Sequence, residues 1–295
     1  MLLAQKMLDG KQFGSIAETM RFPIVRYHLT ILLMNKKQSS TLFVLLFCKG
    51  FTSKKERGEE MKKAFVFDVD DTIYDQQNAF KRAFDKQFSA YNDVVDDVDL
   101  YKLMKEYGDE SFASTGFDSG KLRRMQIHRI KRALEDYDIK ITDKQALRFQ
   151  LDFENFQNDI SLFPFMKSIF DELTRAGVPL GIITNGTIKK QSKKIEQLGL
   201  NNWFPEENII ISEEIGVSKP KRKIFENFEE TLKLPSEEIF YIGDNFLNDI
   251  VGPKSLGWKT IWVNYRSQRL IDKSIVPDYS VFSPVELYKT IMELI

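Results

Sequence analysis

Residues 65–74 read Phe-Val-Phe-Asp-Val-Asp-Asp-Thr-Ile-Tyr, an apolar run that breaks into three carboxylates within four residues. Residues 64–67 are uncharged and rich in β-formers, which predicts a short strand buried on both faces. The carboxylates of Asp68, Asp70 and Asp71 repel one another and raise one another's pKa unless a positive charge offsets them. By itself this stretch supports two interpretations equally: a divalent-cation site at the end of a strand, or an Asp-rich turn.

Apolar and amphipathic segments alternate from residue 161 to the C-terminus. Strands are predicted near residues 179–184, 208–212, 239–243, 260–264 and 279–282, and helices near 164–177, 187–198, 221–232, 248–256 and 284–294. This alternation predicts an α/β fold, a doubly wound parallel sheet covered by helices on both faces. Right-handed crossovers place every strand-to-helix loop at one edge of such a sheet, so polar residues at the strand ends are expected to converge there.

Strand signals stop between residues 76 and 160. Helices are predicted near residues 78–91, 97–107, 119–137 and 142–158. Glycines are expected at the breaks between these helices: Gly108, Gly116 and Gly120. We therefore expect residues 76–160 to form an inserted helical bundle, and residues 61–75 together with 161–295 to form the α/β core.

One of the helices in this insertion is strongly basic. Its cations are Lys121, Arg123, Arg124, Arg129, Lys131 and Arg132. The helix either attracts a phosphorylated substrate or presents a solvated charged face, and the second interpretation is favoured because charge runs on helices usually face water. His128 on the same helix is expected to lie at the surface or to pack, and not to bind a ligand.

The composition is that of an ordinary globular protein, with 42% hydrophobic and 29% charged residues. The formal net charge is zero, so nothing points to a nucleic-acid polymer or an anionic membrane as a partner. The single cysteine, Cys48, excludes an internal disulfide and favours a reducing, cytoplasmic location. With His28 and His128 as the only histidines, a histidine-based metal centre or a Ser-His-Asp triad is not expected. The oligomeric state stays open.

Residues 1–60 lack the alternation and read as an N-terminal extension. Their two apolar segments, 30–34 and 41–48, are far shorter than the ~20 residues of a membrane span. Residues 54–60, Lys-Lys-Glu-Arg-Gly-Glu-Glu, can be encoded by purine codons alone, as a translated ribosome-binding site would be, and Met61 follows at once. We therefore hypothesise that translation starts at Met61; the alternative is a disordered arm that ends in a solvated charge run. The absence of a GGAGG-like tract upstream of the Met61 codon would refute the hypothesis.

Four short motifs, in order, resemble those of the haloacid dehalogenase (HAD) superfamily. The Asp-x-Asp-x-Thr of residues 68–72 resembles the first motif, and an apolar strand that ends in Thr184 resembles the second. Lys219 before a helix resembles the third, and the Gly-Asp-x-x-x-x-Asp of residues 243–249 resembles the fourth. The resemblance extends from about Lys63 to the C-terminus. It implies a Rossmann-like core and a helical cap, inserted after the first motif, that closes over the active site.

The resemblance also implies a Mg²⁺-dependent phosphatase. Asp68 would be the nucleophile that forms an aspartyl-phosphate, and Asp70 the general acid and base, with a pKa that its crowded surroundings shift toward neutrality. The implied Mg²⁺ ligands are carboxylates of Asp68 and Asp244 and the backbone carbonyl of Asp70. Asp249 would be a further ligand or a neighbour that holds one.

The phosphate group would be held by residues of the second and third motifs. The Thr184 hydroxyl and the backbone N–H groups of Asn185 and Gly186 would donate to phosphoryl oxygens, and Lys219 would add a positive charge. Taken singly, Thr184 could merely cap a helix and Lys219 could be a surface lysine. The occurrence of all four motifs in order makes the joint catalytic interpretation the preferred one.

Asp70 distinguishes the reaction classes within the superfamily, because dehalogenases lack this second carboxylate. The implied substrate is a small phosphorylated metabolite, such as a nucleoside monophosphate or a sugar phosphate. Three alternatives stay open: a non-catalytic binding or regulatory protein with this fold, a 2-haloacid dehalogenase, and a phosphomutase.

Overall fold

The computed structural model describes residues 63–295, except for the side chains of residues 111–114. The predicted extension of residues 1–60, Cys48 and the hypothetical start at Met61 lie outside the described residues. The described part belongs to one compact unit, Glu60–Ile295. No helix within residues 63–295 is long and apolar enough to cross a membrane.

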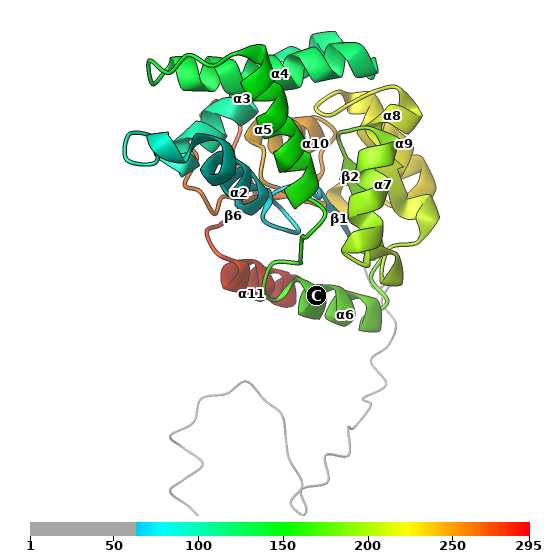
Figure 1. The fold of residues 1–295 in the computed structure, drawn as a ribbon. Helices are drawn as coiled ribbons and strands as arrows, with labels where there is room; N and C mark the ends of the chain where they lie inside the picture. The colour runs from blue at the N-terminus through cyan, green and yellow to red at the C-terminus, as the bar shows by residue number, and fades with distance from the viewer. Residues whose placement is uncertain (1–62) are drawn as a thin grey trace, which may run out of the picture. The chain divides into compact units, whose positions relative to one another are not determined.

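Six parallel strands form a single sheet in the order β3-β2-β1-β4-β5-β6. Figure 1 shows the helices packed around these strands. The strands are β1 (Ala64–Phe67), β2 (Leu180–Thr184), β3 (Ile209–Ile211), β4 (Ile239–Gly243), β5 (Lys259–Val263) and β6 (Tyr279–Val281). The predicted α/β fold with a parallel sheet is therefore confirmed. The strand order reverses between β1 and β4, which is the position where open α/β sheets bind ligands.

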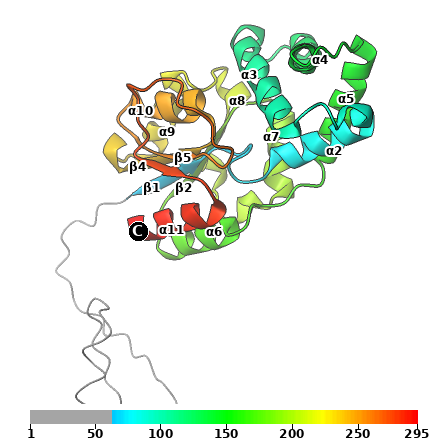
Figure 2. The ribbon, with the colours of Figure 1, turned by 90° about the vertical axis from the view of Figure 1, so that its left-hand side faces the viewer.

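Successive side chains of β1 point to opposite faces of the sheet, as the period of a strand requires. Phe65 and Phe67 pack in a cluster with residues of α6 (Met166–Arg175) and α11 (Pro284–Leu294). Val66 packs in a second cluster with residues of α9 (Arg222–Leu232). Figure 2 shows α6 and α11 side by side on one face, and α9 with α10 (Gly252–Lys254) on the other. Both faces are covered, which explains why the strands are almost continuously apolar.

Four helices between β1 and α6 form a bundle with a core of its own. They are α2 (Gln76–Phe88), α3 (Asp97–Thr115), α4 (Ser119–Glu135) and α5 (Asp143–Phe156). Phe80 lies at the centre of the bundle, with its ring within 6.2 Å of those of Tyr101, Phe149 and Phe153. In Figure 2 the bundle gathers to one side of the sheet. The division into a core and a cap at residues 76 and 160 stays a prediction, because both lie in the same compact unit.

The helix boundaries differ from the prediction where glycines were taken as breaks. Helix α3 continues through Gly108 as far as Thr115, and Gly120 lies inside α4, so two of the three predicted breaks were wrong. Gly108 lies beside an arginine of α4: a Cβ atom there would be 3.4 Å from both Cδ and Nη1 of Arg129, in van der Waals contact. The helix predicted at 248–256 is a π-helical turn, Phe246–Val251, that leads into α10.

Candidate active site

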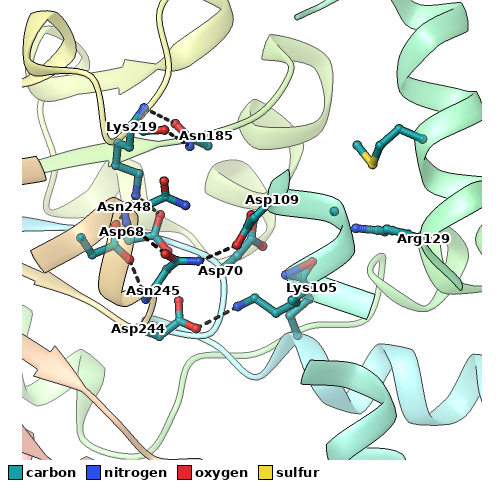
Figure 3. A pocket seen from close by; sticks show the side chains of 14 residues that line it. Asp68, Asp70, Lys105, Asp109, Arg129, Asn185, Lys219, Asp244, Asn245 and Asn248 are labelled. Carbon is teal, nitrogen blue, oxygen red and sulfur yellow. Dashed lines mark hydrogen bonds and ion pairs between the residues drawn. The ribbon is translucent and has the colours of Figure 1, made fainter. Parts of the chain in front are cut away.

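The carboxyl ends of neighbouring strands bring the motif residues together. Asp68 directly follows β1, and its backbone N–H donates to the carbonyl oxygen of Ile242 on β4 at 2.9 Å. This register places Asp68 beside Asp244, which follows β4. A cavity of about 190 Å³ opens at this edge of the sheet (Figure 3).

Two groups of residues line the cavity. We call the first the core wall: Asp68, Asp70, Asn185, Lys219, Asp244, Asn245, Asn248 and Asp249. We call the second, contributed by α2 to α4, the cap wall: Gln76, Lys105, Gly108, Asp109, Met125 and Arg129. Figure 3 shows Lys105 and Arg129 extending from their helices toward the core wall.

Three buried carboxylates of the core wall form a compact cluster. Asp68, Asp244 and Asp249 each offer an oxygen, and these oxygens lie within 4.8 Å of one another. A Cβ atom on Gly243 would lie 2.4 Å from the Asp249 carboxyl group, so only glycine lets this carboxylate fold back against the strand end. The backbone N–H of Asn245 donates to Asp249 at 2.9 Å and holds it there. A set of hard carboxylate oxygens at this spacing fits Mg²⁺.

Lys219 is the cation of the core wall. Its Nζ atom donates to Asp68 and Asp249 at 2.7 Å each, and to the hydroxyl of Tyr241 at 2.8 Å. The Asn185 side chain fixes the Lys219 backbone, accepting from its N–H at 2.9 Å and donating to its carbonyl at 3.1 Å. The second and third motifs are thereby joined through a single asparagine.

One lysine does not balance the carboxylates around it. Burial raises the pKa of Asp68 to about 7, with Asp249 and Asp70 adding to the rise against the opposing charge of Lys219. Burial likewise raises the pKa of Asp244 to about 6, although Lys105 opposes it. The core wall is short of positive charge, and a divalent cation is the species that would supply it.

Asp70 lines the cavity, but its carboxylate makes its hydrogen bonds outside the cluster of Asp68, Asp244 and Asp249. It accepts from Lys194 Nζ at 2.6 and 2.8 Å, from Gln191 Nε2 at 3.0 Å and from the hydroxyl of Tyr74. Burial raises the pKa of Asp70, but the charge of Lys194 and these hydrogen bonds outweigh it, and the net pKa is lowered. The expectation of a pKa shifted toward neutrality was therefore wrong, because α7 (Ile188–Gln197) supplies a buried cation.

The residues predicted to hold phosphate differ in their surroundings. Thr184 Oγ1 is buried and has no hydrogen-bond partner among the described residues, so this hydroxyl is free to donate. Asn185 lines the cavity. The Gly186 N–H donates to Ser212 Oγ at 2.9 Å and would have to leave this partner to bind phosphate, so its role stays a prediction. Neither Thr184 nor Gly186 is among the cavity-lining residues found within the described chain.

Asp71 links the helical bundle to the loop after β5 through ion pairs with Lys105 and Arg266. Its buried carboxylate accepts from Lys105 Nζ at 2.8 Å, from Arg266 Nη2 at 2.7 Å and from the Tyr101 hydroxyl. Burial raises the pKa of Asp71, but Lys105 and Arg266 outweigh it and bring the pKa to about 2. The third carboxylate of the opening motif thus holds two cations and does not join the cluster.

The cap wall contains functional candidates that the sequence reasoning missed. Lys105 also donates to Asp244 at 2.8 Å, and Asp109 accepts from Asn245 Nδ2 at 2.6 Å, so α3 reaches the core wall at two points. Lys105 follows the buried Tyr101 by four residues, and this helical spacing was a usable signal that it faces inward. Arg129 was named, but as part of a charged face that was expected to be solvated. His128 is exposed, which agrees with its expected surface position.

Comparison with known proteins places this geometry in a family. The model of the haloacid dehalogenase-like hydrolases matches residues 65–263. A glyceraldehyde 3-phosphate phosphatase from Methanopyrus kandleri is 28% identical over 79% of this chain and 99% of its own length. The structure of the magnesium-bound HAD-family hydrolase YfnB from Bacillus subtilis is 25% identical, with a TM-score of 0.59, and the match covers 79% of this chain and 99% of that one. L-2-haloacid dehalogenase from Xanthobacter autotrophicus shares the fold, with a TM-score of 0.60 at 18% identity over 79% of this chain and 99% of that one. The chain belongs to the haloacid dehalogenase-like hydrolase family.

Proposed function

We propose that this protein is a Mg²⁺-dependent phosphatase that hydrolyses a small phosphorylated metabolite through an aspartyl-phosphate on Asp68. The observation that carries the proposal is the carboxylate cluster of Asp68, Asp244 and Asp249, packed against Lys219 at the point where the strand order reverses. The names of relatives support phosphate-ester chemistry. Besides the phosphatase above, a pyrimidine 5'-nucleotidase from Escherichia coli is 36% identical over 38% of this chain and 49% of its own length.

Asp68 is the proposed nucleophile. Lys219 donates to its Oδ1 atom, which orients the carboxylate and leaves Oδ2 to attack phosphorus. The hydroxyl of Thr184 and the backbone N–H of Asn185 would hold phosphoryl oxygens. Mg²⁺ held by Asp68, Asp244 and Asp249, and by the predicted Asp70 carbonyl, would offset the negative charge of the phosphate.

Asp70 is the proposed general acid and base. Its carboxylate lines the cavity and is held by Lys194 in the charged form, which suits the activation of water. To protonate the leaving alkoxide, Asp70 must first carry a proton; it gives this proton to the alkoxide and, as the carboxylate, takes one back from the attacking water, so the cycle balances. Lys194 is therefore a positioning residue that controls the protonation state of Asp70.

Two alternatives are separated by specific observations. A dehalogenase would not use Asp70. The dehalogenase structures that resemble this chain are 15–22% identical to it, which supports the fold alone. A non-catalytic protein would not need a buried carboxylate cluster, whose charges repel one another. The single Cys48 supports a reducing, cytoplasmic compartment for the proposed enzyme.

The test is release of phosphate from p-nitrophenyl phosphate with Mg²⁺ and with EDTA. Asp68→Asn is expected to lower kcat by at least about 10⁴-fold, because no other group attacks phosphorus. Asp93→Asn, at an exposed position, is the matched control and is expected to keep full activity. Circular dichroism checks that both variants are folded. Undiminished turnover by Asp68→Asn would refute the nucleophile assignment.

A further inference from the structure

Arg129 lies on the cap wall, and its positive charge has no carboxylate partner among the described residues. It lies on α4 and lines the cavity, and Figure 3 shows its side chain pointing in from the bundle. Among residues 63–295, no carboxylate lies within ion-pair distance of its guanidinium group. Its Nη2 atom donates to Gln150 at 3.2 Å, and the ring of Phe153 lies 5.9 Å away. Its Nε atom is buried and has no hydrogen-bond partner in the described part of the chain.

The nearest carboxylates are already in use. Asp109 accepts from Asn245, and Glu154 accepts from Arg123 at 3.1 and 3.2 Å and from Lys190 at 2.7 Å. Arg123 stands on the same helix as Arg129, so one helix carries a paired arginine outside the cavity and an unpaired one inside it. Burial lowers the pKa of Arg129, and the charges of Tyr101, Asp109, Glu154 and Asp70 offset this lowering only in part.

Residues of two neighbouring helices contact the Arg129 side chain. Gly108 on α3 lies beside it, so that a Cβ atom there would be 3.4 Å from Cδ and Nη1 of Arg129, in van der Waals contact. Gln150, buried on α5, accepts from one edge of the fork. A planar fork of donors that is half-buried, contacted from two sides and without an ion-pair partner among the described residues is suited to binding a carboxylate or a phosphate in two-point contact.

We propose that Arg129 binds a second acidic group of the substrate, a carboxylate or a phosphate, in addition to the phosphate ester that is hydrolysed. This inference rests on the proposed phosphatase function and specifies its substrate class. The cavity of about 190 Å³ is smaller than the roughly 300 Å³ at which pockets for drug-sized ligands begin, so the molecule is a short-chain one. Lys105 does not serve this purpose, because Asp71 and Asp244 already hold it.

The experiment compares substrates that differ in one group. Glyceraldehyde 3-phosphate carries an aldehyde where 3-phosphoglycerate carries a carboxylate, and propane-1,3-diyl bisphosphate carries a second phosphate. We expect kcat/KM for at least one of the two diacids to exceed that for glyceraldehyde 3-phosphate by about 100-fold, the usual scale for a buried charge pair. The diacid that gains identifies the group that Arg129 binds.

Variants then assign the preference to the arginine. Arg129→Met is expected to abolish the preference, mainly through KM, and to leave p-nitrophenyl phosphate turnover within about 3-fold. Arg129→Lys, which keeps the charge but not the fork, should retain part of it. Arg124→Met, at an exposed position on the same helix, is the control and should retain all of it.

Two results would overturn the inference while leaving the phosphatase proposal intact. One is equal turnover of the aldehyde and both diacids by the wild-type protein. The other is an equal loss on all substrates in Arg129→Met, which would indicate a structural role. If the protein hydrolyses none of these substrates, binding is measured instead. Calorimetry follows the binding of 3-phosphoglycerate and propane-1,3-diyl bisphosphate to Asp68→Asn, with and without Arg129→Met. Weaker binding of either diacid without Arg129 supports the inference, and unchanged binding of both contradicts it.

Discussion

The two walls of the cavity carry opposite electrical imbalances. On the core wall, Asp68 and Asp249 share Lys219 while Asp244 lies in the same carboxylate cluster, and negative charge is in excess. On the cap wall, Arg129 has no carboxylate partner among the described residues, and positive charge is in excess. A metal cation would neutralise the excess charge of the core wall, and an anion would neutralise that of the cap wall. The difference agrees with the roles proposed above, in which the α/β sheet supplies the reaction chemistry and the helical bundle selects the substrate.

After loss of the nucleophile itself, the largest expected effect comes from weakening the core wall at Asp244. Asp244→Asn removes a charged oxygen from the cluster, and we expect Mg²⁺-dependent turnover to fall by about 10³-fold, since the metal is worth several kcal/mol in the transition state. Isothermal titration with Mg²⁺ should show weaker binding in parallel. Mg²⁺ affinity equal to that of the wild-type protein would show that the carboxylate cluster is not the metal site.

A smaller effect is expected when Asp70 loses its cation. Lys194→Met removes the charge that stabilises the ionised form, so the pKa of Asp70 rises and the acid limb of the pH–rate profile moves to higher pH. We expect kcat to fall by about 100-fold, and Lys194→Arg to restore most of it. Lys193→Met, exposed on the same helix, is the control. An unshifted acid limb would mean that Asp70 is not the group that titrates.

Lys105 lies on the cap wall, but its charge neutralises a carboxylate of the core wall, Asp244. Lys105→Met leaves Asp244 and Asp71 with one cation fewer, and we expect Mg²⁺ to bind about 10-fold more tightly through the added negative charge. Titration calorimetry at constant ionic strength measures this change. Lys102→Met removes a more exposed lysine of the same helix and should leave Mg²⁺ binding unchanged. Weaker Mg²⁺ binding by Lys105→Met would contradict the view of Lys105 as a competitor of the metal.

The smallest effects concern stability in EDTA, and here Asp68 and Asp71 should differ in sign. The pKa of Asp68 is about 7 in the folded state against an ordinary 3.8, so this charge destabilises the fold increasingly as pH rises from 4 to 7. Asp68→Asn should therefore raise the Tm by several degrees at pH 8 and give no gain near pH 4. Asp71, with its pKa lowered to about 2, stabilises the fold above pH 4 and loses this effect as pH falls toward 2.

Asp71→Asn should accordingly lower the Tm at pH 8, since Lys105 and Arg266 lose their shared carboxylate. Thermal unfolding followed by circular dichroism measures both variants. A shift of the Tm in the same direction for Asp68→Asn and Asp71→Asn would contradict the view that the Asp68 charge destabilises the fold while the Asp71 charge stabilises it.

The sheet and the core wall could be predicted because local patterns determine them. The strand Ile239–Gly243 and the helix Pro284–Leu294 occur where they were predicted. Residues at parallel strand ends converge whatever the rest of the chain does, and this placed Asp68 beside Asp244. The short spacing from Gly243 to Asp249 is likewise a local feature of the chain.

The cap wall and the state of Asp70 could not be predicted, because they depend on contacts between distant helices. Which face of α4 meets the cavity is decided by packing against α3 and α5, and no motif marks Arg129 among its basic neighbours. Gly108 was taken as a helix break, but α3 continues through it beside a side chain of another helix, a contact between segments that no local pattern indicates. Lys194 lies 124 residues from Asp70, and nothing in either segment indicates that they pair.

The central claim is that Asp68, and no other carboxylate, attacks phosphorus. Its most direct test is rapid acid quenching of the wild-type protein during turnover with Mg²⁺, then borohydride reduction and peptide mass spectrometry. An acyl-phosphate is reduced to an alcohol, so the account predicts homoserine at position 68 and unmodified aspartate at positions 70, 244 and 249. Homoserine at another position, or steady phosphate release with position 68 always recovered as aspartate, would contradict it.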